Sequence, residues 1–229
     1  MPVTLTWLGH ASWQLQTERH SILIDPFLDD SPNAPVKAKD VAADFILVSH
    51  GHFDHIADAA QIANRTGATV VSNYEITTWL TKQHGVKNTV GGNLGGGVDV
   101  AFGRVKLTLA FHSSSLPDGS NGGNPCGFLL SLSSGQRIYF ACDTALFGDM
   151  SLIGAGGLDL AVLPIGDLFT MGPEDALAAV KLLKPKRVVP SHYDTWPPIA
   201  QDAEKWAARV RAETAAEAVV LKPGGTITL

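Results

Sequence analysis

A histidine-rich hexapeptide is the feature that most limits how this chain can fold. Residues 50–55 read His-Gly-His-Phe-Asp-His and directly follow the apolar run 45–48. Three imidazoles and one carboxylate within six residues are typical of a metal site, because nitrogen and oxygen ligands at short spacing bind a cation. An apolar run that ends in such a turn predicts a strand with ligands at its carboxyl end. We therefore expect the site at the edge of a sheet, within reach of water and substrate.

Length and composition favour one globular domain spanning residues 1–229. A hydrophobic content of 45% is enough for a well-buried core. The net charge of -5 and the lack of a basic cluster disfavour a nucleic-acid partner. The chain has no basic leader and no long apolar segment, so we expect a cytoplasmic protein without a membrane partner. Cys126 and Cys142 are expected to be reduced thiols.

Hydrophobic periodicity predicts many strands and four helices. Strand patterns occupy residues 3–8, 13–17, 21–24, 45–49, 98–102, 105–111, 127–132, 137–142, 187–189, 218–221 and 226–229. Helical patterns occupy residues 56–66, 73–85, 173–183 and 203–210. The segments 91–97 and 117–125 are expected to be loops. Strands followed by helices in both halves of the chain favour a layered α/β sandwich.

Three further candidate ligands stand just past predicted strands. They are His112, Asp143 and His192. Side chains at the carboxyl ends of neighbouring strands converge on one edge of a sheet, so separate segments can line one cleft. Together with the hexapeptide they make seven candidate ligands, which is enough for two divalent ions that share a bridging carboxylate.

The order of these ligands resembles that of the metallo-β-lactamase superfamily. Four further phrases are similar to its metal-dependent hydrolases related to ascorbate-6-phosphate lactonase: Trp7-Leu8-Gly9-His10-Ala11, Ile24-Asp25-Pro26-Phe27, His112-Ser113-Ser114-Ser115 and Phe169-Thr170-Met171-Gly172-Pro173-Glu174-Asp175. The resemblance covers nearly the whole chain and implies a four-layer αββα sandwich of the α/β class. It does not define the substrate, because the superfamily includes lactonases, thioesterases, phosphodiesterases, nucleases and redox proteins.

The resemblance also implies roles for individual residues. One ion would be held by His50, His52 and His112, the other by Asp54, His55 and His192, with Asp143 as the bridge. Zn²⁺ and Mn²⁺ suit these mixed ligands, and Fe²⁺ would also accept them. Asp25 is expected to orient a metal ligand by a contact from outside the ligand set. His10 is expected to contact the substrate or to transfer a proton.

The chemistry implied is hydrolysis by a hydroxide that bridges the two metals. A divalent cation lowers the pKa of its bound water to about 7, and a second ion polarises the bond under attack. Asp54, His10 and Asp143 are the expected catalytic residues. The proton for the leaving group is left open between His10, Tyr193 and a water molecule. No serine nucleophile is expected, because the serines that follow His112 lack the strand-to-helix elbow of an activated serine.

The expected substrate is a small ester, lactone or phosphate-containing molecule. The spacing between ligands leaves no room for the large inserted domain of the RNA-processing members. Alternatives are a phosphodiesterase that acts on a nucleotide-type substrate, a metal-binding protein without catalysis, and a di-iron redox protein, which usually has a glutamate where His52 stands. The loops 113–125 and 167–173 are candidate borders of the site. The sequence leaves open whether the chain forms a homo-oligomer.

Overall fold

Strands and helices alternate along the computed structural model, which describes residues 2–229. One set of strands comprises β1 (Thr4–Trp7), β2 (Trp13–Gln16), β3 (Ser21–Ile24), β4 (Phe45–Leu47), β5 (Thr69–Asn73), β6 (Thr89–Gly92) and β14 (Thr226–Thr228). The other comprises β7 (Gly97–Val100), β8 (Gly103–Leu109), β9 (Cys126–Leu132), β10 (Arg137–Phe140), β11 (Leu160–Pro164), β12 (Arg187–Ser191) and β13 (Glu217–Ala218). The helices are α1 (Phe53–Ile56), α2 (Ala59–Thr66), α3 (Tyr74–His84), α4 (Met150–Gly154), α5 (Pro173–Leu183) and α6 (Ala203–Glu213), with 3₁₀ turns η1 (Ala38–Asp40) and η2 (Pro197–Ile199).

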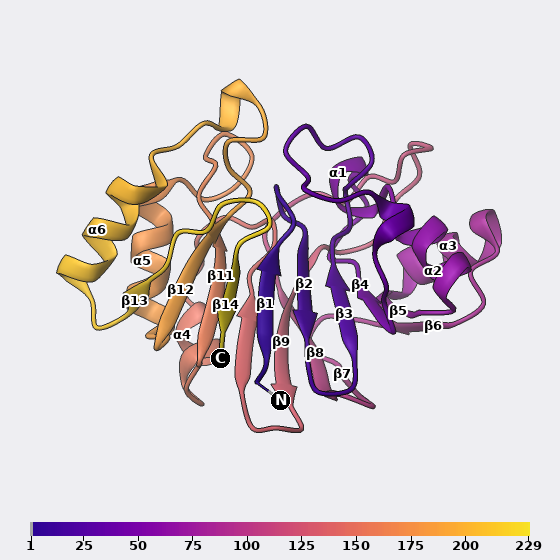
Figure 1. Ribbon diagram of the computed structural model, residues 1–229, viewed down its shortest axis with the longest axis horizontal. Helices are drawn as coiled ribbons and strands as arrows, with labels where there is room; N and C mark the ends of the chain where they lie inside the picture. The colour runs from indigo at the N-terminus through magenta and orange to yellow at the C-terminus, as the bar shows by residue number, and fades with distance from the viewer. Residues whose placement is uncertain (1) are drawn as a thin grey trace.

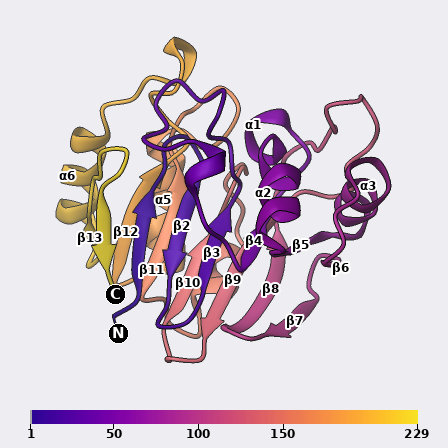
Figure 2. The same ribbon diagram turned by 45° about the vertical axis from the view of Figure 1, so that its right-hand side comes forward.

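The strands form two seven-stranded sheets between two layers of helices. The first sheet has the order β14-β1-β2-β3-β4-β5-β6, and the second has the order β13-β12-β11-β10-β9-β8-β7. Helices α5 and α6 lie outside the second sheet, and α2 and α3 lie outside the first, as Figures 1 and 2 show. The predicted αββα sandwich is therefore confirmed. None of the helices in residues 2–229 is both long and apolar enough to span a bilayer.

Strand directions bring the loops after β1, β3, β4, β8, β10, β11 and β12 to one edge. In the first sheet β2 runs antiparallel to β1 and β3, and β4 runs parallel to β3. In the second sheet β9 runs antiparallel to β8 and β10, and β10, β11 and β12 are parallel. The two edges meet where His192 N donates to His10 O at 3.0 Å. The carboxyl ends of these strands therefore surround a shared region.

The main core lies between the two sheets. Inward residues alternate along β1, where Leu5 and Trp7 are buried while Thr4 and Thr6 are half-buried. The inward side chains of both sheets belong to one continuous cluster, and each large apolar side chain in it contributes about 1.5–3 kcal/mol to stability. A second cluster packs α2 and α3 against the outer face of the first sheet. A rigid sandwich thus supports the loops at its edge.

The boundaries of α3 and the start of α5 follow the capping signals in the sequence. The Asn73 side chain accepts a hydrogen bond from Ile76 N at 2.9 Å, and α3 ends at Gly85 with a φ of 67°. Pro173 occupies the first turn of α5. An N-cap oxygen satisfies a free backbone amide, and a C-terminal glycine adopts the left-handed conformation at low cost. These two predicted helices are confirmed.

Two predicted segments differ from the structure. The helix expected over 56–66 starts at Ala59 as α2, after the separate short helix α1. Between them, Asp58 turns its carboxylate to the amides of Leu28 and Asp29 at 2.6 and 3.1 Å. The loop expected over 91–97 begins inside β6, which pairs in parallel with β5. A Cβ at Gly91 would lie only 2.6 Å from Thr77 Oγ1. Glycine there reflects close packing of β6 under α3, not a turn.

Candidate metal centre

Six loops deliver the candidate site residues to the shared edge. His10 follows β1, Asp25 follows β3, the hexapeptide follows β4, His112 follows β8, Asp143 follows β10 and His192 follows β12. The structure brings all of these segments together around Asp143. Because the loops come from both sheets, the centre forms only when the whole sandwich is folded.

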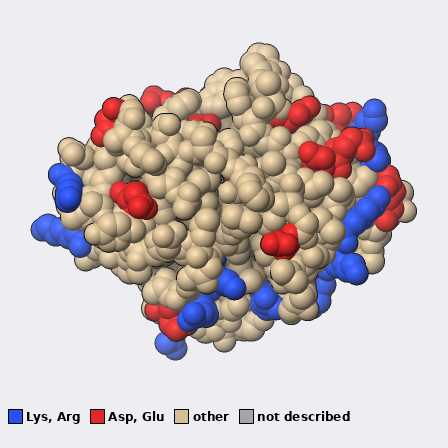
Figure 3. All heavy atoms as spheres, turned by 180° about the vertical axis from the view of Figure 1, so that it is seen from behind, with Lys and Arg blue, Asp and Glu red and all other residues tan. Residues whose placement is uncertain are grey.

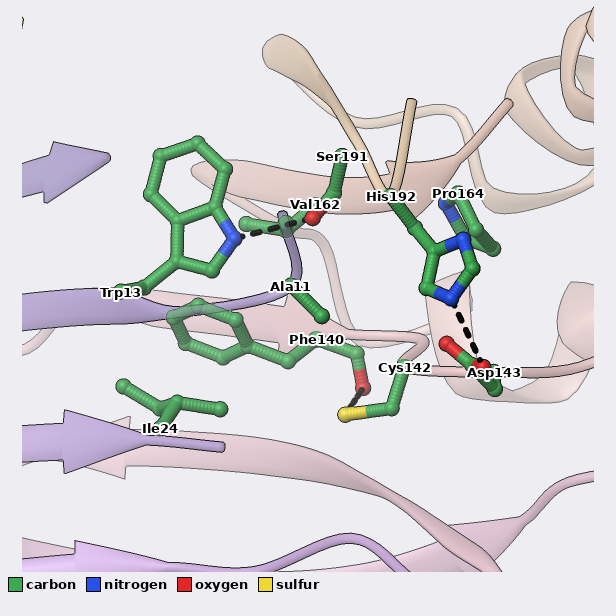
Figure 4. A pocket seen from close by; sticks show the side chains of 10 residues that line it. All are labelled: Ala11, Trp13, Ile24, Phe140, Cys142, Asp143, Val162, Pro164, Ser191 and His192. Atoms are coloured by element: carbon green, nitrogen blue, oxygen red, sulfur yellow. Dashed lines mark hydrogen bonds and ion pairs between the residues drawn. The ribbon is translucent and has the colours of Figure 1, made fainter. Parts of the chain in front are cut away.

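The Asp143 carboxylate lies among four imidazoles. Its Oδ2 atom is 3.1 Å from His192 Nε2, 3.3 Å from His55 Nε2, 3.6 Å from His112 Nε2 and 3.9 Å from His50 Nε2. Figure 4 shows the His192 ring directed at this carboxylate. Burial acts to raise the pKa of Asp143, but the charges of His192 and His55 outweigh it and hold that pKa well below its usual value. Asp143 is therefore an ionised carboxylate that lies close to four imidazole nitrogens.

One group of donors consists of His50, His52 and His112. Their ligand atoms all lie within 4.8 Å of one another. His52 Nδ1 is 2.9 Å from His50 Nε2 and 3.3 Å from His112 Nε2. Burial lowers the pKa of all three imidazoles, and that of His50 falls well below its usual value. Neutral imidazoles present lone pairs, so this group can bind a borderline cation.

A second group of donors consists of His10, Asp54, His55 and His192, whose ligand atoms also lie within 4.8 Å of one another. Burial acts to raise the pKa of Asp54, but the charge of His55 outweighs it and keeps the carboxyl group ionised. Burial acts to lower the pKa of His55, but nearby carboxylates, Asp143 first, hold it well above its usual value. The electrostatic field of the carboxylates near this group therefore favours a positive charge.

Three buried polar atoms of the centre lack a hydrogen-bond partner. They are His55 Nε2, Asp143 Oδ1 and His192 Nδ1. A buried polar atom without a partner costs about 1–3 kcal/mol, so such atoms rarely persist without a ligand. A divalent cation accepts lone pairs from both atom types, and the residues present therefore fit a metal.

Asp25 contacts two of the histidines on the side away from the centre. It contacts His55 directly and His50 through Ser49. Its Oδ2 atom accepts from Ser49 Oγ at 2.6 Å and lies 2.9 Å from His55 Nδ1, while Oδ1 accepts from Ser49 N at 2.7 Å. Ser49 has one hydroxyl proton, which it donates to Asp25, so it accepts from His50 Nδ1 at 2.9 Å. Both imidazoles then carry their proton on Nδ1 and present Nε2 to the centre. These contacts suit the orienting role predicted for Asp25, which stays a prediction.

His10 is buried and has a partner at each ring nitrogen. Nε2 lies 3.1 Å from Asp54 Oδ2, and Nδ1 lies 2.8 Å from Thr195 Oγ1. Burial, followed by the charge of His192, lowers the pKa of His10 to about 4, so the ring is neutral. A carboxylate only accepts, so His10 donates through Nε2 and accepts from the Thr195 hydroxyl at Nδ1. This geometry suits a positioning role for His10, and the predicted substrate contact or proton transfer stays a prediction.

Residues that sequence reasoning did not single out are Ser49 and Thr195. Ser49 directly precedes the hexapeptide, so its position at the end of a strand was the available signal. Thr195 lies in the turn after His192, and its role depends on a contact with His10 across 185 positions of the chain. Periodicity and motif spacing carry no information about such a contact.

Several site loops turn through left-handed backbone at residues other than glycine. The φ angles are 49° at His10, 46° at Asp25, 53° at Cys142 and 55° at His192. Each such residue costs about 1–3 kcal/mol and persists only where the surroundings enforce it. Strain of this kind gathers at functional sites, and here it directs side chains toward the centre.

The geometry agrees with comparisons to known proteins. The profile of the beta-lactamase superfamily domain matches residues 20–193. This chain belongs to the beta-lactamase superfamily. UPF0173 metal-dependent hydrolases of Thermus thermophilus and Thermococcus kodakarensis are 51% and 47% identical to it. These matches cover 99% of this chain in both cases and 99% and 100% of the relatives.

A solved structure has the same fold. Igni18, a metallo hydrolase from the archaeon Ignicoccus hospitalis, superposes with a TM-score of 0.90 at 35% identity and covers 100% of this chain and 99% of its own. The superfamily prediction is confirmed, and the chain belongs with the UPF0173 metal-dependent hydrolases. The closer likeness to ascorbate-6-phosphate lactonase stays a prediction.

Proposed function

We propose that the whole chain acts as one hydrolase domain with two divalent ions at its centre, and that it cleaves a small ester, lactone or phosphate-containing molecule. Zn²⁺ and Mn²⁺ are the proposed ions, with Fe²⁺ as a further candidate. The observation that carries the proposal is the position of Asp143 Oδ2, within 3.9 Å of four imidazole nitrogens. One oxygen among so many donors suits a ligand shared between two cations.

The two groups of donors support an assignment of ligands. The first ion would be held by His50, His52 and His112, and the second by Asp54, His55 and His192, with Asp143 shared. Asp25 fixes the tautomer of two of these histidines. Such outer contacts change metal affinity by about 10–100-fold in other sites.

When bound, divalent ions lower the pKa of a water molecule and polarise the bond to be cleaved. The chain's own residues position the reactants around that chemistry. Asp54 stays ionised and can accept a hydrogen bond from the attacking water, while His10 holds the carboxylate in place. The exposed Ser113 hydroxyl lies 3.3 Å from His52 Nε2 and can contact the substrate.

Tyr193 is a poor donor of the proton that the leaving group needs. Its ring packs on Trp7 with centroids 5.1 Å apart, and its burial raises the pKa of the phenol above its usual range. His10 already donates its single proton to Asp54. Of the three candidates, we therefore propose a water molecule of the cleft for this step.

Removal of metal should abolish hydrolysis. Activity is first found with a screen of ester, lactone, thioester and phosphodiester substrates, and the protein is then treated with a chelator. An ion present at 1,000 times its Kd stabilises the fold by about 4 kcal/mol, so we expect Tm to fall by about 8–16 °C. Zn²⁺ or Mn²⁺ should restore both properties, whereas Mg²⁺, which prefers oxygen ligands, should restore little. Full hydrolysis by metal-free protein would contradict the proposal.

A further inference from the structure

Exposed apolar side chains gather on the loops that carry the metal ligands. Six large hydrophobic side chains are exposed among residues 2–229, and four of them lie in these loops or in the loop between them. They are Phe53, Phe111, Leu168 and Phe169, with exposed fractions of 56%, 55%, 65% and 59%. The other two lie on α3 and α4. Clustering of this kind marks a binding surface, whereas single exposed side chains need no explanation.

The loop that carries Leu168 and Phe169 lies beside the centre. It follows β11, which is paired in parallel with β10 on one side and β12 on the other, and these two strands lead to Asp143 and His192. Its end is tied to the loop of Asp143, because Met171 N donates to Thr144 O at 3.0 Å.

The same loop is strained in a way that keeps its tip exposed. Asp167 and Leu168 have φ angles of 62° and 51°. The Asp167 side chain accepts from Leu168 N at 2.9 Å and so holds the turn. Two successive left-handed residues that are not glycine cost free energy, and such strain persists at ligand sites. The turn presents Leu168 and Phe169 to solvent instead of folding them into the core.

Phe111 extends this apolar surface along the rim. Phe111 N donates to Thr144 Oγ1 at 2.9 Å, so Phe111 and the loop at 165–171 flank the same threonine. The Phe111 ring contacts Phe147 edge to face with centroids 5.6 Å apart. We call Phe111, Leu168 and Phe169 the apolar rim. It adjoins the ligand His112 through Phe111 and the ligand Asp143 through Thr144.

Two aromatic side chains, Phe53 and Trp196, lie beside the second group of donors. Phe53 stands between His52 and Asp54 in the chain, and its ring is 6.2 Å from that of Trp196. Trp196 in turn lies 5.0 Å from His10, measured between ring centroids. The centre is therefore bordered by apolar groups from both sheets.

The segments that flank the candidate metal ligands lack cationic side chains. No lysine or arginine occurs in residues 8–12, 48–58, 110–125, 141–149, 165–172 or 192–202. Lys37 and Lys39 lie in the long loop after β3, where Lys37 Nζ is held by Asp29 O at 2.7 Å. In Figure 3, Lys and Arg lie mainly along the sides and lower edge of the face shown. Proteins usually bind phosphate groups with Arg or Lys, so a phosphate-bearing substrate has few partners here.

We propose that the substrate is a carboxylic ester with an apolar acyl chain, with its carbonyl at the metal centre and its chain along the apolar rim. This proposal rests on the proposed hydrolase function and narrows it. The oxygen of water bonds to the acyl carbon, the bond between that carbon and the alcohol oxygen breaks, and the alcohol oxygen takes a proton. The products are the carboxylate, the alcohol and one released proton. Each methylene that leaves water should increase affinity by about two- to fourfold.

A binding experiment tests the rim without relying on turnover. Zinc-loaded protein is titrated with butanoate and with octanoate, the product acids of a short and a long ester, in a calorimeter. We expect octanoate to bind at least tenfold more tightly than butanoate. Phe169→Ser should reduce this ratio to about threefold or less, and Leu168→Ser should act in the same direction.

Leu152→Ser is the matched control, because Leu152 is 72% exposed on α4, outside the ligand loops. It should leave the ratio unchanged. Equal affinity of the wild-type protein for both acids would overturn the proposal. A similar ratio in Phe169→Ser and Leu152→Ser would also overturn it.

Hydrolysis of three substrates separates this proposal from the function on which it rests. The substrates are p-nitrophenyl butanoate, p-nitrophenyl octanoate and bis(p-nitrophenyl) phosphate. We expect kcat/KM to be at least tenfold higher for the octanoate than for the butanoate, with weaker cleavage of the phosphate diester. Cleavage of the phosphate diester alone would overturn the ester proposal and leave the hydrolase function intact. No cleavage of any substrate by protein that holds its ions would overturn both.

Discussion

Asp143→Asn should remove ions from the centre and lower kcat/KM by about 10³-fold. The substitution keeps the size of the side chain but removes the negative charge that four imidazoles surround at 3.1–3.9 Å. Metal ions stabilise developing charge by several kcal/mol, and a loss of about 4 kcal/mol corresponds to about 10³-fold in rate. Elemental analysis of the purified variant and kinetics on any substrate of the wild-type protein measure the two effects.

Asp99→Asn is the matched control for this experiment. Asp99 lies on β7 with its side chain 78% exposed and pairs with Arg104 at the surface, remote from the ligand loops. An exposed ion pair contributes about 0–1 kcal/mol, so this variant should keep wild-type metal content and rate. Wild-type metal content and activity in Asp143→Asn would show that Asp143 is not a shared ligand.

Asp25→Asn should weaken metal binding by about 10–100-fold and destabilise the fold by about 3 kcal/mol. The buried carboxylate accepts three hydrogen bonds, two from Ser49 and one from His55, and an amide cannot accept at both of its ends. Outer contacts of this type set ligand orientation, and loss of a buried charged partner is costly. Asparagine tolerates the φ of 46° at this position, so backbone strain does not explain the effect. Zinc titration and urea unfolding measure the two quantities.

Ser49→Ala tests the Ser49 hydroxyl separately from the other hydrogen bonds of Asp25. The variant loses the hydroxyl that links Asp25 to His50 but keeps the backbone amide bond at 2.7 Å and the bond to His55. We therefore expect a loss of metal affinity smaller than that of Asp25→Asn. Equal metal affinity in Asp25→Asn and the wild-type protein would show that Asp25 does not orient the metal ligands.

The convergence of the candidate ligands could be predicted from sequence because it depends on position along strands. His112, Asp143 and His192 each stand just past an apolar run, and parallel strands place such positions at one edge. The hexapeptide indicated a metal, and the remaining candidates are imidazole or carboxylate side chains that stand at strand ends. Strand order and direction then brought them together.

The contacts behind the ligands could not be predicted in the same way. Thr195 and Ser49 matter because of single hydroxyl groups whose partners depend on the exact path of their loops. The same limit applies to His10, whose neutral, buried ring is defined by Asp54 and Thr195. Loop conformation at left-handed residues is not encoded in a hydrophobic pattern.

Some strands were also missed for physical reasons. Every residue of β11 is buried, and a continuous apolar run has neither the period of a strand nor that of a helix. The glycines of β6 have the composition of a loop, yet their pairing with β5 makes them part of a sheet. Burial on both faces and close packing against α3 are properties of the tertiary structure, which local sequence does not reveal.

The number of ions bound to each chain tests the central claim most directly. Native mass spectrometry of the wild-type protein, loaded with Zn²⁺ and freed of excess metal, gives this number without a substrate. Two groups of donors around one shared carboxylate predict a mass increase of two zinc ions per chain. A mass that matches the metal-free chain, or one with a single ion under saturating Zn²⁺, would contradict the account.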